Sequence, residues 1–195
     1  MKKIKEEVLN NTSLPLYEER EVNKVFPVIG EGSYDADIMF IGEAPGRNEA
    51  KFGRPFCGES GKLLDELLSL INIDRENVYI TNIIKDRPPF NRDPSPEEIT
   101  SYSPYLDRQI EIIRPKVIAT LGRYSMRYIL DKLGCQDVKG SISELHGKEF
   151  TGKHHDDEVV IVPLFHPAVA IYNRNRKSEL IDDFKILEKY NGTHK

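Results

Sequence analysis

Apolar runs alternate with helical patterns along most of the chain. Four runs have the length and composition of buried strands, at residues 37–41, 77–82, 116–121 and 158–164. Apolar residues recur with helical spacing in four further stretches, at residues 62–71, 96–113, 124–133 and 178–190. Strands that alternate with helices in this way predict an α/β fold, a three-layer α/β/α sandwich with a central four-stranded parallel sheet.

The residues outside this alternation predict less regular structure. Residues 1–10 read as a short polar helix, and residues 11–35 mix prolines and glycines with single apolar residues, as in an irregular lead-in. Residues 134–157 are rich in turn formers and indicate a hairpin. Since no internal repeat or flexible linker interrupts the chain, we expect one domain over residues 1–195.

A loop rich in glycine and proline, residues 42–61, follows the first predicted strand. Proteins of the α/β class place ligand sites outside the carboxyl ends of strands, and long loops in compact domains are more often functional than structural. The loop carries charged and aromatic candidates for a site, namely Glu43, Arg47, Glu49, Arg54 and Phe56. On these residues alone, a ligand site and an elaborate connection fit the sequence equally well.

Three of the four predicted strands end in residues capable of chemistry. Glu43, Asn82 and His166 lie at the ends of the first, second and fourth strands, and the carboxyl ends of parallel strands share one edge of a sheet. Singly, each residue is more often a loop carboxylate, a turn former or a packed histidine. Together, with Phe56 as a stacking surface, they indicate a site for a small planar polar ligand.

Composition narrows the class of protein. The 195 residues are 38% hydrophobic and 31% charged, which is typical of a globular protein with a sizeable core. A net charge of −4 argues against a protein that coats nucleic acid nonspecifically, but leaves a local basic face possible. No run approaches the roughly 20 apolar residues of a membrane span, so we expect a cytoplasmic protein without a membrane partner. The two cysteines, Cys57 and Cys135, have no metal-ligand spacing.

Eight short motifs together resemble the uracil-DNA glycosylase superfamily, and most closely its iron–sulfur branch, family 4. They occur in the family's order and spacing between residues 11 and 188. Their positions are 42–49, 53–56, 60–61, 81–82, 87–92, 115–116, 121–122 and 166–168. The resemblance implies hydrolysis of the N-glycosidic bond of deoxyuridine in DNA, with the base flipped into a pocket and an abasic site left behind.

The resemblance also implies roles for individual residues. Asn82 would hydrogen-bond the uracil edge, Phe56 would stack on the base, and His166 would donate a hydrogen bond to O2 of the leaving uracil. Other branches carry an aspartate where Ala44 stands, so Glu43 or a backbone carbonyl would position the attacking water. The remaining residues expected to bind the substrate are Gly42, Ala44 and Glu49, with Glu49 near C5 of the base.

DNA would be held by basic residues and by tight backbone turns beside the site. The residues expected at this surface are Pro45, Gly46, Arg47, Ser60, Gly61, Arg87 and Arg174. Further basic residues in the same loops are Lys51, Arg54, Lys85, Arg92, Arg176 and Lys177. Residues 172–174 either enter the duplex in place of the flipped base or form an ordinary helix C-terminal turn. We expect single- or double-stranded DNA as the partner and a monomeric protein.

The chain departs from the family at the positions of the cluster ligands. The iron–sulfur branch has four cysteines, and their positions here carry Asn11, Leu14, Asp86 and Tyr102. None is a thiolate, so we expect no cluster, no other cofactor and no metal site, and we expect Leu14 and Tyr102 to fill the space with apolar contacts. The run His-His-Asp-Asp-Glu at 154–158 reads as a solvated turn.

Alternatives to a uracil glycosylase remain open at this point. A superfamily member could act on another deaminated base, hypoxanthine or xanthine, although Asn82 favours uracil. A catalytically silent DNA-binding homologue would keep the fold, but it would be expected to have lost Phe56, Asn82 or His166. A hydrolase of free nucleosides, or a nucleotide-binding α/β protein, is disfavoured by the basic loops and by the absence of a phosphate-cradling Gly-x-x-x-x-Gly-Lys motif.

Overall fold

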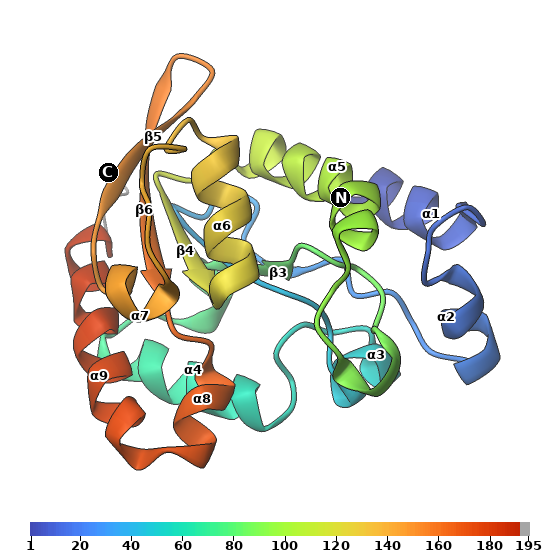
Figure 1. The fold of residues 1–195 in the computed structure, drawn as a ribbon, viewed down its shortest axis with the longest axis horizontal. Coiled ribbons are helices and arrows are strands. Elements are labelled where there is room, and N and C mark those ends of the chain that lie inside the picture. The colour runs from blue at the N-terminus through green and yellow to red at the C-terminus, as the bar shows by residue number, and fades with distance from the viewer. Residues whose placement is uncertain (192–195) are drawn as a thin grey trace.

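The computed structural model describes residues 1–191, apart from the side chains of Tyr172, Arg174 and Asn175. Its centre is a sheet in the order β1-β3-β2-β4-β6-β5 (Figure 1). The strands are β1 (Glu31–Gly32), β2 (Ile38–Gly42), β3 (Tyr79–Asn82), β4 (Val117–Leu121), β5 (Phe150–His154) and β6 (Asp157–Leu164). Strands β3, β2, β4 and β6 run parallel, which confirms the predicted four-stranded core of the sheet. The edge strands β1 and β5 pair antiparallel, and β5 with β6 forms the expected hairpin.

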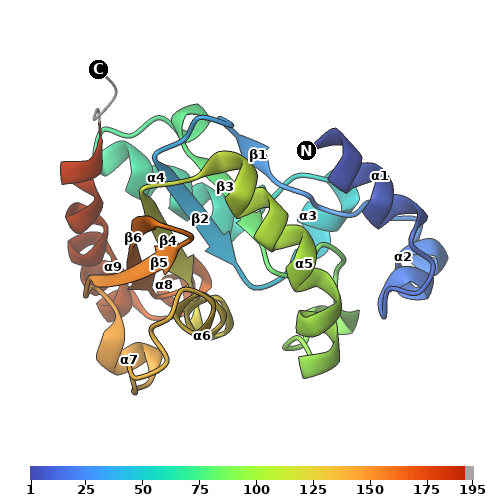
Figure 2. The ribbon, with the colours of Figure 1, turned by 90° about the horizontal axis from the view of Figure 1, so that it is seen from above.

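Helices cover both faces of the sheet, as a three-layer sandwich requires. They are α1 (Lys2–Asn10), α2 (Tyr17–Asn23), α3 (Arg47–Phe52), α4 (Glu59–Leu70), α5 (Pro96–Ile113), α6 (Arg123–Lys132), α7 (Ile142–Leu145), α8 (Pro167–Tyr172) and α9 (Arg174–Lys185). Three short 3-10 helices are η1 (Arg75–Asn77), η2 (Pro89–Asn91) and η3 (Ile186–Tyr190). Figure 2 shows α5 and α6 on one side of the sheet and α4 and α9 on the other.

Alternate residues of each buried strand feed two separate cores. In β2, Met39 and Ile41 pack with apolar residues of α1, α5 and α6, whereas Ile38 and Phe40 pack with those of α4 and α9. All five residues of β2 are buried, because a parallel strand covered on both faces has no solvent side. This explains the unbroken apolar runs from which the strands were predicted.

Several local boundaries follow directly from the sequence. Helix α5 begins where the sequence predicts it: the Ser95 hydroxyl accepts from the Glu98 N–H at 3.2 Å, and the Glu98 carboxylate accepts from the Ser95 N–H at 2.8 Å. The lead-in is more regular than expected, because α2 forms between residues 17 and 23, and Ile4 and Val8 of α1 are buried. None of the helices within residues 1–191 is long and apolar enough to cross a membrane.

The register of the parallel strands aligns their carboxyl ends. Gly42 lies opposite Asn82, and Leu121 lies opposite Leu164. The loops that leave these ends therefore begin at one edge of the sheet. The first of them folds into α3 and then α4, and the others lead to η2, α6 and α8.

Candidate functional site

A cavity of about 750 Å³ lies at this edge of the sheet. Its volume falls within the range of small-molecule sites. The loops and helix starts after β2, β3, β4 and β6 line it with Glu43, Ala44, Pro45, Gly46, Arg47, Asn48, Glu49, Phe56, Gly58, Glu59, Ser60, Asn82, Pro88, Asn91, Arg92, Asp93, Pro94, Gly122, Arg123, Ile142, Phe165, His166, Ala168, Val169 and Ile171. The structure thus brings together Glu43, Asn82 and His166, which the sequence predicted to converge.

Close packing of Gly42, Phe56 and Asn82 forms one wall of the cavity. A Cβ atom on Gly42 would lie 2.3 Å from Asn82 Oδ1 and 2.8 Å from Phe56 Cζ, so only glycine fits there. Asn82 is 2% exposed, and its Oδ1 has no hydrogen-bond partner among the described residues. A buried acceptor without a partner is costly, by about 1–3 kcal/mol. This oxygen is therefore available to a donor that enters the cavity.

His166 is held in one protonation form by the start of α8. Its Nδ1 accepts from the Ala168 backbone N–H at 3.1 Å, so the ring caps the helix and the proton of the neutral ring is on Nε2. Burial lowers the pKa of His166 to about 4. The imidazole is thus neutral near pH 7 and has an Nε2–H to donate. Its ring centroid lies 5.6 Å from that of Phe56, with 30° between the planes.

Glu43 follows β2 in the chain, and its carboxylate lies at the start of α6. Its Oε1 accepts from the Tyr124 backbone N–H at 3.2 Å, a favourable place for a carboxylate. Burial raises the pKa of Glu43, and the Tyr124 N–H opposes this shift. Gly122, at φ 105°, allows the approach, because a Cβ there would lie close to Glu43 Oε1. Glu43 is therefore oriented into the cavity by backbone contacts.

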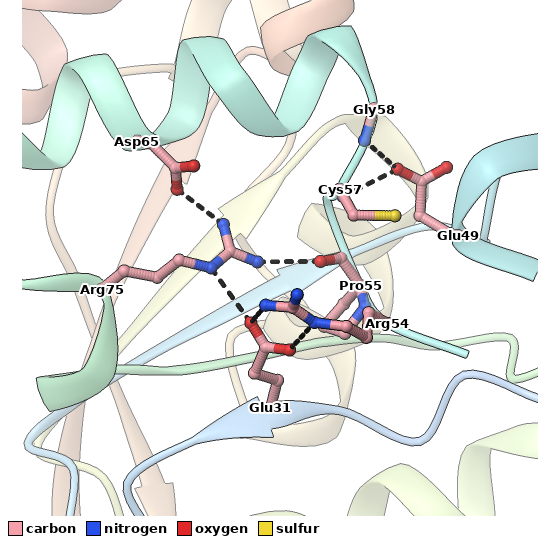
Figure 3. Close-up of polar contacts among 8 residues, drawn as sticks. All are labelled: Glu31, Glu49, Arg54, Pro55, Cys57, Gly58, Asp65 and Arg75. Carbon is pink, nitrogen blue, oxygen red and sulfur yellow. Dashed lines mark hydrogen bonds and ion pairs between the residues drawn. The ribbon is translucent and has the colours of Figure 1, made fainter. Parts of the chain in front are cut away.

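Glu49 fixes the loop that carries Phe56 (Figure 3). Its Oε1 accepts from the backbone N–H groups of Cys57 at 2.9 Å and Gly58 at 2.8 Å. One oxygen of the carboxylate is thus bound to the loop, at the start of α4. The structure gives Glu49 this support function in addition to its place in the cavity lining.

Arg75 braces the same loop from the other side (Figure 3). Its guanidinium donates to the Pro55 carbonyl at 2.8 Å, to Asp65 Oδ1 at 2.7 Å and to Glu31 Oε1 at 3.2 Å. Glu31 also pairs with Arg54 at 2.6 Å. Phe56 itself has φ 46°, in the left-handed region that is strained for a bulky side chain. These contacts on both sides hold it there.

Most of the expected DNA-contacting residues lie at the cavity or in the loops beside it. Pro45, Gly46, Arg47 and Ser60 line the cavity, and Arg47 is exposed with no carboxylate partner among residues 1–191. Arg87 donates to Asn91 Oδ1 at 2.6 Å, again without a carboxylate partner in the described chain. The side chain of Arg174, like that of Tyr172 in the segment proposed to enter the duplex, lies outside the described residues.

The expected contact of Lys85 with DNA is wrong. Lys85 is fully buried, and its Nζ lies 2.9 Å from the Thr81 hydroxyl, 2.6 Å from the Asn82 carbonyl and 2.5 Å from Gln109 Oε1. It therefore supports the end of β3 and cannot reach a phosphate. The DNA contact of Gly61 stays a prediction; Gly61 is buried, and a Cβ there would collide with the Phe56 carbonyl. Its lack of a side chain serves packing.

The remaining basic residues of these loops are mostly in ion pairs. Arg92 Nη2 lies 2.6 Å from Glu98 Oε1, Arg54 pairs with Glu31, and Lys177 Nζ lies 3.0 Å from Glu66 Oε2. Arg123, on the cavity wall, pairs with Asp93. The sequence did not identify Gly122, Arg123 and Asp93 as site residues, although Gly122 belongs to the motif at 121–122 and Arg123 follows it after a predicted strand.

The positions of the cluster ligands in family 4 are filled by a buried polar network. Asp86 accepts from Arg20 Nη1 at 2.8 Å and from the Tyr102 hydroxyl at 2.7 Å. Arg20 also donates to the carbonyls of Val8 and Leu9.

Apolar filling is only part of this arrangement. Leu14 and Tyr102 are buried in the core as expected, but the Arg20–Asp86 ion pair was not foreseen. Asn11 donates to the Tyr105 hydroxyl at 3.0 Å. Amide, alkyl, carboxylate and phenol groups do not fit an iron–sulfur cluster. Nor do the described residues contain another group of His, Cys, Asp and Glu able to hold a metal ion.

The family model and the similar proteins found by comparison agree on one family. Residues 29–185 match the family model described as the uracil DNA glycosylase superfamily. A type-4 uracil-DNA glycosylase of Sulfurisphaera tokodaii is 47% identical over 190 residues, which cover 97% of this chain and 84% of that protein. A type-4 enzyme of Archaeoglobus fulgidus is 44% identical over 85% of this chain and 82% of its own length. One of Thermotoga maritima is 42% identical, over 92% and 86%.

Proposed function

The chain belongs to the uracil DNA glycosylase superfamily, and from this premise we propose that it hydrolyses the N-glycosidic bond of deoxyuridine in DNA. The products are free uracil and an abasic site. The observation that supports this proposal most directly is the buried, unpartnered Oδ1 of Asn82 on the cavity wall.

Asn82 matches the edge of uracil. Its Oδ1 accepts from the uracil N3–H, and its amide NH₂ donates to O4. Cytosine presents an acceptor at N3 and an amino group at C4, so both contacts fail and the buried oxygen stays unpaired. Sites built on such pairing reject the unmatched analogue by up to about 10⁴–10⁵-fold. The closely packed Phe56 ring offers the stacking surface for the base.

His166 and Glu43 have separate roles in the hydrolysis. As the bond to the sugar breaks, negative charge develops on uracil O2, and the neutral His166 donates a hydrogen bond from its Nε2–H to that oxygen. One such preorganised donor is worth about 2.7–4 kcal/mol of transition-state stabilisation in other enzymes. Glu43, oriented by the start of α6, positions the water that attacks the sugar carbon. Ala44 lines the cavity beside Glu43 with a small side chain, and Gly42 lets Asn82 and Phe56 pack closely at the base site.

DNA is held by the rim of the cavity. Arg47 and Arg87 are free of carboxylate partners within residues 1–191 and face phosphates. Pro45, Gly46 and Ser60 let the backbone approach the strand, and the contact expected of Arg174 lies outside the described residues. Monomeric state and cytoplasmic location remain predictions.

Labelled oligonucleotides test the proposed reaction. Each contains U opposite G, U opposite A, unpaired U or hypoxanthine, and abasic sites are cleaved by alkali. We expect cleavage at uracil that falls at least about 100-fold in Asn82→Ala, because the variant lacks both contacts to the base. Asn10→Ala is the matched control, since Asn10 lies exposed on α1. Cleavage at hypoxanthine alone would favour another deaminated base, and DNA binding without any cleavage would favour a silent homologue.

A further inference from the structure

Phe90 is an aromatic residue whose side chain is almost fully exposed to solvent. Its side chain is 96% exposed, the largest value among the exposed large hydrophobic residues of the described chain. A phenyl ring in this position gains nothing from burial in the core. Its backbone also adopts the left-handed conformation, with φ 55° and ψ 20°, and the next residue, Asn91, has φ 55°. A bulky residue in this region is strained, and such strain is concentrated at functional positions.

The loop around Phe90 is rigid. Pro88 and Pro89 restrict the backbone before it. The N–H of Asn91 donates to the Pro88 carbonyl and the N–H of Arg92 to the Pro89 carbonyl, both at 3.1 Å. Side chains lock the turn further, because Arg87 donates to Asn91 Oδ1 and Arg92 binds the Glu98 carboxylate. The backbone that carries the ring is therefore restricted and has little entropy to lose on binding.

This rigid turn stands at the edge of the cavity. Pro88 and Asn91, on either side of Phe90 in the chain, both line the cavity, whereas Phe90 itself does not. Its ring thus projects into solvent from the rim. In Figure 1 the loop before α5, drawn in green, lies beside α3, and α8 lies well apart from it on the other flank. A strand that enters the cavity beside Pro88 and Asn91 passes the turn that carries Phe90.

We propose that Phe90 stacks on the face of a DNA base next to the uracil. This inference rests on the proposed function, since it is the removal of uracil from the stack that leaves a neighbouring base face uncovered. The chemistry is favourable, because every base has a face for an aromatic ring. The guanidinium of Arg87, which belongs to the same turn, binds the adjoining phosphate. This contact does not read the base sequence, so any of the four bases can be the stacked neighbour.

Binding to a duplex that contains a stable tetrahydrofuran abasic site tests this contact without any catalytic step. The variants are Phe90→Ala, Phe90→Tyr and, as the matched control, Phe52→Ala, whose ring is 60% exposed at the end of α3 away from the cavity lining. We expect Phe90→Ala to weaken binding by about 5- to 150-fold, the range for losing one stacked base. Phe90→Tyr keeps a ring and restores binding to within about threefold, and Phe52→Ala leaves binding unchanged.

Stability separates a role in binding from a role in the fold. Glycine relieves the left-handed strain, so Phe90→Gly should raise the melting temperature by about 1–4 °C and still bind DNA as weakly as Phe90→Ala. A quenched 2-aminopurine next to the abasic site, which brightens in Phe90→Ala, would give direct evidence for stacking. Wild-type affinity in Phe90→Ala would overturn the proposal. A wild-type protein that binds the abasic duplex but cleaves no uracil would overturn the proposed reaction and leave the stacking contact standing.

Discussion

The Arg20–Asp86 pair offers the sharpest test of how this chain is stabilised where family 4 has a cluster. Both side chains are 1% exposed, and the closest contact between them is 2.8 Å. In Asp86→Ala the Arg20 guanidinium keeps its hydrogen bonds to the carbonyls of Val8 and Leu9 but loses its one buried carboxylate partner. Removing one partner of a buried ion pair costs about 3–5 kcal/mol. Native domains are stable by only about 5–15 kcal/mol, so this is a large fraction.

Urea unfolding followed by far-UV circular dichroism measures the loss, since the chain has no tryptophan. A loss of this size corresponds to a fall in melting temperature of about 6–20 °C for a domain of this length. The double variant Arg20→Met/Asp86→Ala removes both charges, and we expect it to be more stable than the sum of the two single losses predicts, by at least about 1 kcal/mol. The matched control is Glu59→Ala, which breaks an exposed pair with Lys62 and should cost less than about 0.5 kcal/mol.

Salt gives an independent check on the same pair. A pair shielded from solvent is little screened, so the cost of Asp86→Ala should be nearly the same at low and high sodium chloride. The reasoning is refuted if Asp86→Ala costs less than about 1 kcal/mol, or if the single losses simply add in the double variant. Either result would mean that the Arg20–Asp86 pair adds little to the other contacts that hold the helices α1 and α2.

Two further predictions concern the supports of the site. Lys85→Met removes the donor to the Asn82 carbonyl and leaves buried acceptors unpaired. The free energy of unfolding should therefore fall by about 2–4 kcal/mol, and kcat/KM on uracil DNA should fall at least about tenfold. Unchanged kinetics would contradict this prediction, and Lys62→Met on the surface is the control. The pKa of about 4 for His166 lies below the value of about 6.5 in an unfolded chain. Its contribution to stability is therefore complete above about pH 6.5 and is lost as the pH falls toward 4. Imidazole nitrogen shifts should report a neutral ring at pH 5.5, and a ring already protonated at pH 6 would contradict the assignment.

The sequence predicts the sheet well because burial on both faces leaves a strong local signal. The apolar runs at β2 and β4 are uninterrupted, and chain direction in a parallel sheet then brings Glu43, Asn82 and His166 to one edge. The short helices α2, α3 and α8 were missed, because six or seven residues carry too little periodicity to be distinguished from a loop.

Long-range polar partners are what the sequence does not reveal. Lys85 follows a strand in a loop-like stretch and resembles a surface cation, yet its partner Gln109 lies 24 residues away on α5. Arg20 and Asp86 are 66 residues apart. Whether a charged residue is exposed or buried depends on which partner the fold brings to it, and no local pattern contains that information.

The three side chains proposed to touch uracil are each supported by a contact that involves the main chain. The Ala168 N–H holds His166, Lys85 binds the Asn82 carbonyl, and Glu49 binds the N–H groups that follow Phe56. Preorganised sites depend on such supporting contacts. None of these three runs through the positions of the cluster ligands, where the network around Asp86 ties α1 and α2 to α5 and to the end of β3. In this chain the ion pair at those positions therefore holds the lead-in, and it is separate from the contacts that orient the site.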